Sequence, residues 1–278
     1  MKTTSISKRE TQNFQKQIWD FYDKKGRHNL PWRKTSNPYH ILVSEIMLQQ
    51  TQVARVLEKY SLFIKKYPTV KSLANASVSD ILEIWIGLGY NRRALSLKRG
   101  AEKILIKHKG IMPKERYELE ALPGIGPYTA GAIRAFAFNL PEIFIETNIR
   151  RVYIHHFFKN KKNIDDKEII PIVHATLAVG RPREWYWALM DYGAHVPKFK
   201  KTNPNTKSKH YVKQSKFDGS KRQLRGNILK LLQGNIEYPI EIISKKIART
   251  PKILSPILDE LTDEGFIEKK NEHYYIKK

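Results

Sequence analysis

Apolar residues in the first two-thirds of the chain recur with the spacing of amphipathic helices. Phe14, Ile18, Phe21 and Tyr22 follow one another at intervals that place them on one helical face. Alternation of apolar and polar residues is scarce before residue 215, so we expect few strands there. The pattern predicts helices over residues 11–24, 40–63, 91–108, 116–122, 127–138, 146–158, 167–179 and 183–193, and a further one capped by Ser77 or Ser79 that runs through Ile86.

The pattern changes after the last of these helices. Residues 198–217 are polar and basic with few apolar positions, which predicts a linker or a DNA-binding arm. Residues 218–278 then show three short helical segments, at 221–233, 240–248 and 251–264, followed by two short strands around Lys270 and Asn271. Three small helices and a hairpin are typical of a winged-helix-like α+β domain. The sequence therefore predicts a mostly α-helical domain over residues 1–197, the basic segment, and a small second domain.

Composition narrows the class of protein. The chain has 278 residues, with 51 Lys and Arg against 27 Asp and Glu, a net charge of +24. Such an excess indicates a polyanionic partner, most simply DNA, although a generally basic proteome is an alternative. The sequence has no cysteine, which excludes disulfides, cysteine nucleophiles and cysteine-bound metal clusters. Residues 1–9 are too polar for a signal peptide and no apolar run could span a membrane, so we expect an intracellular, cytoplasmic protein associated with the nucleoid.

A glycine hairpin is the first candidate for chemistry. In Leu122-Pro-Gly-Ile-Gly126, Gly124 and Gly126 permit positive φ and a close approach to a sugar–phosphate backbone. The backbone N–H groups at the start of the following helix could hold a phosphate. An ordinary corner between two helices is the alternative. Glu146, shortly afterwards, could cap a helix or face a cleft as a catalytic anion.

Two further stretches carry polar groups suited to nucleic acid. Glu45 lies among apolar residues, where burial would raise its pKa and let it act as an acid. The glutamines that follow it suit base edges, although a solvated helix face is the alternative. In the second stretch, Gly87 and Gly89 present Tyr90 for stacking or wedging between bases. An ordinary connection between helices is the alternative there.

Together these stretches resemble the helix-hairpin-helix DNA glycosylase superfamily, and within it the adenine DNA glycosylases of the MutY type. The likeness covers about residues 12–197 and includes LPWR at 30–33, SEIMLQQTQV at 44–53, GLGYNRRA at 87–94, LPGIGPYTAGAI at 122–133, NIRRV at 148–152 and MDYGA at 190–194. The resemblance implies two helical subdomains around a cleft, and flipping and hydrolytic removal of adenine opposite 8-oxoguanine or guanine. A thymine or uracil mismatch glycosylase and a non-catalytic DNA-binding or damage-sensing protein remain alternatives.

The resemblance also assigns roles to residues. Glu45 matches the general acid that protonates adenine at N7. Tyr128 stands where bifunctional members carry a lysine that forms a Schiff base, which implies a monofunctional glycosylase with little lyase activity. Glu146 stands where the family has an aspartate, one methylene shorter, and Asn148 matches a family asparagine. Trp32 and Arg33 are expected in the base pocket. The residues expected to contact DNA are Gln49, Gln50, Thr51, Gln52, Gly87, Leu88, Gly89, Tyr90, Arg92, Arg93, Leu122, Gly124, Gly126 and Arg150.

Two departures from the family pattern follow from the sequence. The four cysteines that bind an iron–sulfur cluster are absent, so we expect no cofactor, and the histidines have no spacing that favours a metal. Residues 218–278 are too few for the additional domain with which typical members recognise 8-oxoguanine. The expected partner is double-stranded DNA with a mismatch or an oxidised guanine, bound by a monomer.

Overall fold

The computed structural model describes residues 6–200, 202–214, 216–234 and 236–278. They divide into two compact units, each of which combines segments that are distant in sequence. The first unit comprises residues 6–45, 114–121 and 125–213, and the second comprises residues 46–113, 122–124 and 214–278. Helix α2 (Pro38–Leu48) begins in the first unit and ends in the second.

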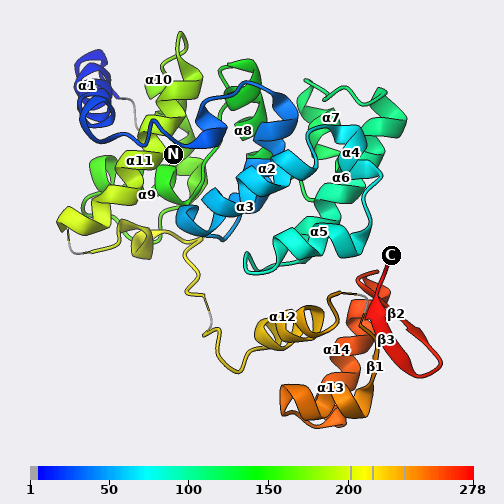
Figure 1. Cartoon of the computed structure of the whole chain (residues 1–278). Helices are drawn as coiled ribbons and strands as arrows, with labels where there is room; N and C mark the ends of the chain where they lie inside the picture. The colour runs from blue at the N-terminus through cyan, green and yellow to red at the C-terminus, as the bar shows by residue number, and fades with distance from the viewer. Residues whose placement is uncertain (1–5, 201, 215, 235) are drawn as a thin grey trace. The chain divides into compact units, whose positions relative to one another are not determined.

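The first unit is almost entirely helical (Figure 1). Local sequence signals explain where several helices begin: Ser7 and Glu10 form a capping box at α1, and Asp165 and Glu168 form another at α10. Its elements are α1 (Lys8–Lys25), η1 (Pro31–Arg33), α7 (Arg116–Glu120), α8 (Pro127–Phe138), α9 (Thr147–Phe157), α10 (Asp166–Thr176), α11 (Pro182–Lys200) and η2 (Pro204–Lys207).

The core of the first unit is aromatic. Helices α1, α9 and α11 pack together, and they meet at Phe14, Tyr153 and Trp185. The Phe14 ring lies 5.4 Å from that of Tyr153 and 5.9 Å from that of Trp185. Because tilted and edge-to-face pairs of this kind stabilise beyond the area they bury, this cluster anchors the first unit.

The second unit contains a helical part and a small α+β part. The helical part has Phe63, Leu73, Trp85 and Ile104 fully buried at its centre, with Ser77 as the N-cap of α5, one of the two caps that the sequence predicts. Its helices are α3 (Val53–Lys66), α4 (Val70–Ala74), α5 (Val78–Trp85) and α6 (Arg92–His108).

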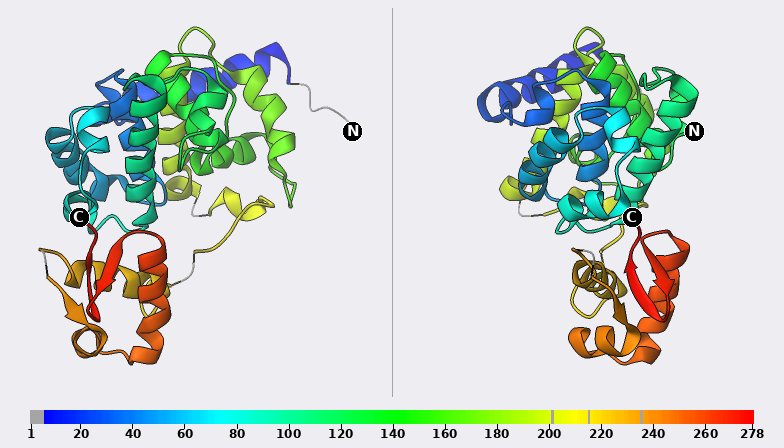
Figure 2. Two further views of the ribbon diagram at one scale, coloured as in Figure 1. Left: turned by 90° about the vertical axis from the view of Figure 1, so that its right-hand side faces the viewer. Right: turned by 45° about the vertical axis from the view of Figure 1, so that its right-hand side comes forward.

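The α+β part has the predicted three helices and hairpin, with one additional short strand. The strands form an antiparallel sheet in the order β1-β3-β2, and β2 packs against α14 (Figure 2). Asn271 and Glu272 connect β2 to β3 with φ values of 48° and 63°, the left-handed pair of a two-residue hairpin loop. Its elements are α12 (Lys221–Leu231), β1 (Tyr238–Pro239), α13 (Ile240–Ile247), α14 (Pro251–Asp263), β2 (Ile267–Lys270) and β3 (His273–Ile276).

Three features differ from the sequence-based expectation. The single helical region predicted over residues 40–63 is two helices, α2 and α3, separated by a turn at 49–52. Helix α11 continues to Lys200. Part of the predicted basic linker folds onto the first unit: Asn205 is buried and donates from Nδ2 to the Thr147 carbonyl at 2.8 Å.

The mostly α-helical class is confirmed, and every named strand in the described residues lies after residue 237. Within these same residues, no helix combines the length and the hydrophobicity that crossing a bilayer would require.

Candidate functional site

Glu45 is buried in helix α2. The helix begins after Asn37, whose Oδ1 accepts a hydrogen bond from the Tyr39 backbone N–H at 2.9 Å. All positions from 41 to 47 are buried, so α2 is enclosed on every side around the carboxyl group. Only 6% of Glu45 is exposed, and this burial raises the pKa of its carboxyl from 4.5 to about 7. The predicted burial of Glu45 is therefore confirmed.

Tyr128 and Glu45 are hydrogen-bonded. Tyr128 stands in the first turn of α8, immediately after Pro127, and its hydroxyl donates to Glu45 Oε2 at 3.0 Å. This bond lowers the Glu45 pKa against the larger effect of burial, while the negative charge of Glu146 raises it and Arg33 lowers it. Burial holds the pKa of Tyr128 well above its usual value of 10, so the phenol remains a proton donor. The Tyr128 ring meets Phe144 edge-on at 5.7 Å, which fixes its direction.

Glu146 is the N-cap of α9. Its Oε1 accepts from the backbone N–H groups of Asn148 at 2.6 Å and Ile149 at 2.8 Å. Burial of the carboxylate raises its pKa, and these two backbone bonds lower it, as do Arg151 and Arg150. The Glu146 residue as a whole is only partly buried, so it is the carboxylate end that is shielded from solvent. The capping alternative is therefore observed, and it leaves the carboxylate close enough to affect Glu45 electrostatically.

Arg151 connects Asn148 to neighbouring segments, a link that the sequence analysis missed. Its Nη1 donates to Asn148 Oδ1 at 2.9 Å and to the Gly193 carbonyl at 2.8 Å. A Cβ on Gly193 would lie 2.3 Å from the Asn148 carbonyl oxygen, so only glycine allows α11 to approach α9 this closely. The spacing of three between Asn148 and Arg151 on a helix was an available signal.

Arg33 forms a buried ion pair with Asp191. Its Nη1 lies 2.7 Å from Asp191 Oδ2 and its Nη2 lies 3.0 Å from Oδ1, and the two side chains are 4% and 2% exposed. Burial alone would raise the Asp191 pKa, but Arg33 and Arg27 hold it below its usual value. The Arg33 guanidinium is thus bound to Asp191 and acts on Glu45 through its charge, and its place in a base pocket stays a prediction. Trp32, its predicted companion, is buried beside it in η1.

In the second unit, the glutamine-rich segment is a turn and not a helix face. Gln50 has a left-handed φ of 52°, and Gln52 is the N-cap of α3. Gln50 and Gln52 are exposed, whereas Gln49 and Thr51 are partly buried. Gln49 Nε2 donates to the Gly124 carbonyl at 3.4 Å, which brings the turn and the glycine hairpin together.

The predicted wedge segment is also a turn with left-handed residues. Gly87, Gly89 and Tyr90 have φ values of 99°, 72° and 49°. Tyr90 is partly exposed, and its hydroxyl accepts from Arg222 at 2.5 Å. Arg92 is exposed and binds Glu264 through two hydrogen bonds of 2.8 and 2.6 Å.

The glycine hairpin has one left-handed glycine. Gly124 has φ +80°, whereas Gly126 has φ −99° and ψ −178°, an extended conformation, so only Gly124 uses the positive φ that glycine permits. Gly126 is the N-cap of α8 and offers no side chain to the first-turn N–H groups, and a Cβ there would meet nothing within 4 Å. The hairpin thus leaves an open helix N-terminus of the kind that binds anions.

Four residues expected to contact DNA have side chains that are buried or hydrogen-bonded within the protein. Leu88 and Leu122 are buried core residues. Arg150 pairs with Asp166 through two bonds of 2.7 and 2.6 Å. Arg93 is buried, with its guanidinium bound to backbone carbonyls. Since these side chains are buried or bound to other protein groups, they support the local structure of the segments that carry them.

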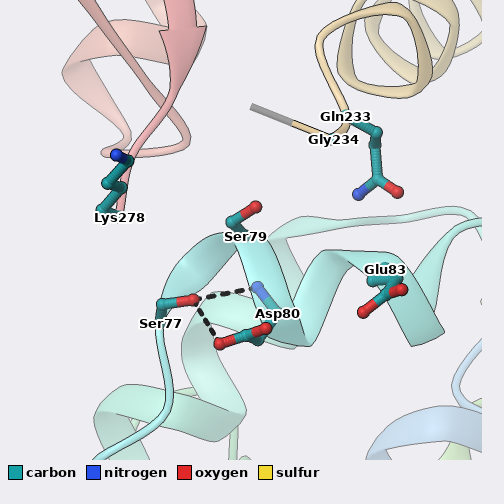
Figure 3. A pocket seen from close by; sticks show the side chains of 7 residues that line it. All are labelled: Ser77, Ser79, Asp80, Glu83, Gln233, Gly234 and Lys278. Atoms are coloured by element: carbon teal, nitrogen blue, oxygen red, sulfur yellow. Dashed lines mark hydrogen bonds between the residues drawn. The ribbon is translucent and has the colours of Figure 1, made fainter. Parts of the chain in front are cut away.

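A cavity in the second unit does not include the candidate residues. It has a volume of about 590 Å³ and is lined by Ser77, Ser79, Asp80, Glu83, Gln233, Gly234 and Lys278 (Figure 3). Its two acids already have a cation, because Lys66 Nζ lies 3.4 Å from Asp80 Oδ1 and 3.1 Å from Glu83 Oε2. The candidate catalytic groups are therefore those around Glu45.

The residues present do not fit an iron–sulfur cluster. The sequence contains no cysteine thiolate to bind iron. Among the described residues, no three His, Asp or Glu side chains are grouped as metal ligands would be.

The comparisons with known proteins agree with this geometry. Residues 43–171, which include Glu45, Tyr128 and Glu146, match the HhH-GPD superfamily of base excision DNA repair proteins. Over these residues the chain is similar to this helix-hairpin-helix superfamily. Over 187 residues it is 39% identical to an adenine DNA glycosylase of Buchnera aphidicola subsp. Baizongia pistaciae, covering 66% of this chain and 52% of that one.

Two more relatives extend the comparison. The chain is 39% identical over 152 residues to an adenine DNA glycosylase of Homo sapiens, covering 51% of this chain and 28% of that one. A solved structure of a thermostable thymine-DNA glycosylase superimposes with a TM-score of 0.60 at 29% identity, covering 66% of this chain and 86% of that one. The chain spans about half the length of the Buchnera relative.

Proposed function

We propose that this protein is a DNA glycosylase that removes adenine from mispairs with 8-oxoguanine or guanine. The observation that carries the proposal is the buried carboxyl group of Glu45, with a pKa of about 7, hydrogen-bonded to Tyr128 and close to the charge of Glu146. A carboxyl that is partly protonated at neutral pH is suited to general acid catalysis. The similarity to curated adenine DNA glycosylases supports adenine as the base.

The reaction divides between two carboxyl groups. Glu45 transfers its proton to N7 of a flipped adenine, and the electron pair of the C1′–N9 bond leaves with the base. The sugar becomes an oxocarbenium-like cation, which the Glu146 carboxylate stabilises. Water then adds to C1′ and gives its proton to the Glu45 carboxylate, which restores the acid. The products are free adenine and an abasic site.

The proposed enzyme is monofunctional. A lyase step requires an amine that forms a Schiff base with C1′, and Tyr128 carries a hydroxyl at the position where bifunctional relatives carry lysine. The Tyr128 phenol is held as a hydrogen-bond donor to Glu45, so its role is to set the pKa and orientation of the acid.

In the second unit, the proposed DNA contacts are the exposed side chains of Gln50 and Gln52 and the partly exposed side chain of Tyr90. In the first unit, the open N-terminus of α8 at Gly126 suits a phosphate. The net charge of +24 would strengthen binding at low salt and make it strongly salt-dependent. Neither a metal nor an iron–sulfur cluster is required by this scheme.

One experiment tests the proposal. The protein is incubated with duplexes that hold A opposite 8-oxoguanine, A opposite G, or T or U opposite G, and abasic sites are then cleaved with alkali. We expect strand breaks only at adenine, only after alkali, and none with Glu45→Gln. Breaks without alkali would contradict the monofunctional assignment, and full activity of Glu45→Gln would contradict the acid assignment.

A thymine or uracil mismatch glycosylase is the second candidate. The structural similarity to a thymine-DNA glycosylase favours it, at 29% identity over most of that chain. Breaks at T or U opposite G, with none at adenine, would establish this function in place of the first. Binding to all duplexes without any alkali-labile site would favour a non-catalytic damage sensor.

A further inference from the structure

Arg93 is a buried cation whose hydrogen bonds all go to neutral oxygens. It lies in the first turn of α6, 9% exposed, between the rings of Trp85 at 5.5 Å and Tyr90 at 5.7 Å. A guanidinium has five N–H donors in a rigid planar fork. In the second unit these donors face two turns that lie far apart in the sequence.

One side of the guanidinium closes the end of α2. Nη1 donates to the carbonyls of Ile46 and Met47, both at 2.8 Å, and to that of Gln49. The last carbonyls of a helix have no partner within it and carry the negative end of the helix dipole. Arg93 therefore satisfies the groups that would otherwise be left unpaired where α2 stops and the turn at 49–52 begins.

The other side holds the turn at 87–90. Nη2 donates to the Gly89 carbonyl at 2.8 Å and more weakly to that of Leu88, while Nε donates to the Tyr90 carbonyl at 3.3 Å. Nη2 also reaches Thr51 Oγ1 at 3.0 Å, so both turns meet at one nitrogen.

Lysine could not replace this arrangement. Burial lowers the pKa of Arg93 to about 10, so the group is still charged at neutral pH and must be compensated by the surrounding dipoles. Three donors on one ammonium nitrogen cannot reach carbonyls on opposite sides of a planar fork. Since the donors are already used within the protein, Arg93 is not available for a phosphate.

We propose that Arg93 is a positioning residue that fixes the turns at 49–52 and 87–90 as one rigid surface, so that both contact the same DNA strand. The DNA contact in this inference rests on the proposed function. The hydrogen bonds by which Arg93 connects the two turns do not, because they are present in the protein without DNA. The exposed side chains of Gln50 and Gln52 and the partly exposed side chain of Tyr90 would then be presented with little conformational entropy to lose on binding.

The test combines hydrogen exchange with binding and catalysis in the full-length protein. Arg93→Lys keeps the charge and removes the fork. Thr51→Val keeps Arg93 in place but removes its bond to Thr51 Oγ1 and the bond from Thr51 Oγ1 to the Leu88 carbonyl at 3.3 Å. Arg99→Lys is the matched control, because it makes the same substitution at an exposed position of α6 where the guanidinium donates to the Glu264 carbonyl. Amide exchange is measured without DNA, then the affinity for an A:8-oxoguanine duplex, and then single-turnover adenine release with all DNA bound.

We expect faster amide exchange in both turns of Arg93→Lys, with about tenfold weaker DNA binding and a nearly unchanged rate once DNA is saturated. Thr51→Val should change amide exchange and DNA affinity in the same direction, but by a smaller amount. Faster exchange in one turn only, or in neither, would overturn the inference, as would unchanged affinity when both turns are loosened. If the wild-type protein releases no adenine, the proposed function fails, while exchange and DNA affinity still decide the role of Arg93.

Discussion

The hydroxyl of Tyr128 donates a hydrogen bond to Glu45 Oε2 at 3.0 Å, across 83 residues of sequence. Burial raises the Glu45 pKa, and this bond acts against that effect because it favours the charged carboxylate. The pair therefore holds the acid near neutrality, where it can both give and accept a proton. Five predictions follow from the structure around this pair and from the segments that support it.

Tyr128→Phe should move the pH dependence of base release upward. Without the hydrogen bond, the Glu45 pKa rises above about 7, so the acid stays protonated to higher pH. The single-turnover rate, which should fall above pH 7 in the wild-type protein, should then fall at a higher pH. Tyr117→Phe, at a residue that is 73% exposed, is the control. A downward shift would show that Tyr128 does not act through this bond.

Glu45→Gln should stabilise the protein at high pH and not at low pH. The folded-state pKa of Glu45 is raised above 4.5, so folding is penalised once the solution is alkaline enough to ionise it. The penalty is absent below about pH 4.5, grows between 4.5 and 7, and reaches roughly 3 kcal/mol above pH 7. Urea denaturation at pH 5 and pH 8.5 measures it. Equal effects of the substitution at both values would contradict the raised pKa.

Glu146→Gln should separate the capping role from the catalytic role. The amide oxygen can still accept from the Asn148 and Ile149 N–H groups, so the free energy of unfolding should change by less than about 1 kcal/mol. The loss of charge should slow base release by about 100-fold or more. Glu146→Ala should also lose about 1 kcal/mol of stability, because the cap disappears. If Glu146→Gln releases the base at the wild-type rate, Glu146 acts only as a helix cap and has no catalytic role.

Asp191→Asn should be strongly destabilising. It leaves the buried Arg33 guanidinium without its charge partner, which typically costs about 3–5 kcal/mol. The matched control is Asp20→Asn, which breaks the exposed pair with Lys16, where the side chains are 52% and 73% exposed. That change should cost less than about 1 kcal/mol. The free energy of unfolding of both variants is measured by guanidinium denaturation. If Asp191→Asn and Asp20→Asn lose similar amounts, the buried pair is not important for stability.

Alanine substitutions at the two hairpin glycines should affect different properties of the protein. Gly124 has φ +80°, and a Cβ there would lie 2.8 Å from Ser96 Cβ, so Gly124→Ala should destabilise by about 1–3 kcal/mol. Gly126 is extended with open space around it, so Gly126→Ala should leave stability unchanged but weaken DNA binding by blocking the approach to the α8 N-terminus. Thermal unfolding and DNA affinity are measured for both variants. A loss of stability in Gly126→Ala, with none in Gly124→Ala, would contradict the geometry.

Local signals predicted much of the fold. Helix α8 begins and ends where the sequence predicts, because Pro127 suits a first turn and Asn139 takes the left-handed conformation after the last. The break at residues 49–52 was missed, since the group that closes α2 is Arg93, which is remote in sequence. The link between Arg33 and Asp191 was missed for the same reason, as 158 residues separate them.

By itself, the sequence determined the helical class, the three helices and hairpin near the C-terminus, the basic charge and the order of motifs shared with the superfamily. These depend on periodicity, capping residues and composition, which act over a few positions. Only the tertiary structure decided that Tyr128 is the hydrogen-bond donor to the Glu45 carboxyl, and that Arg33, Arg93 and Arg150 are occupied within the protein. Burial and pairing depend on groups brought together from distant segments, and no local pattern records which partner an arginine or a carboxylate will meet.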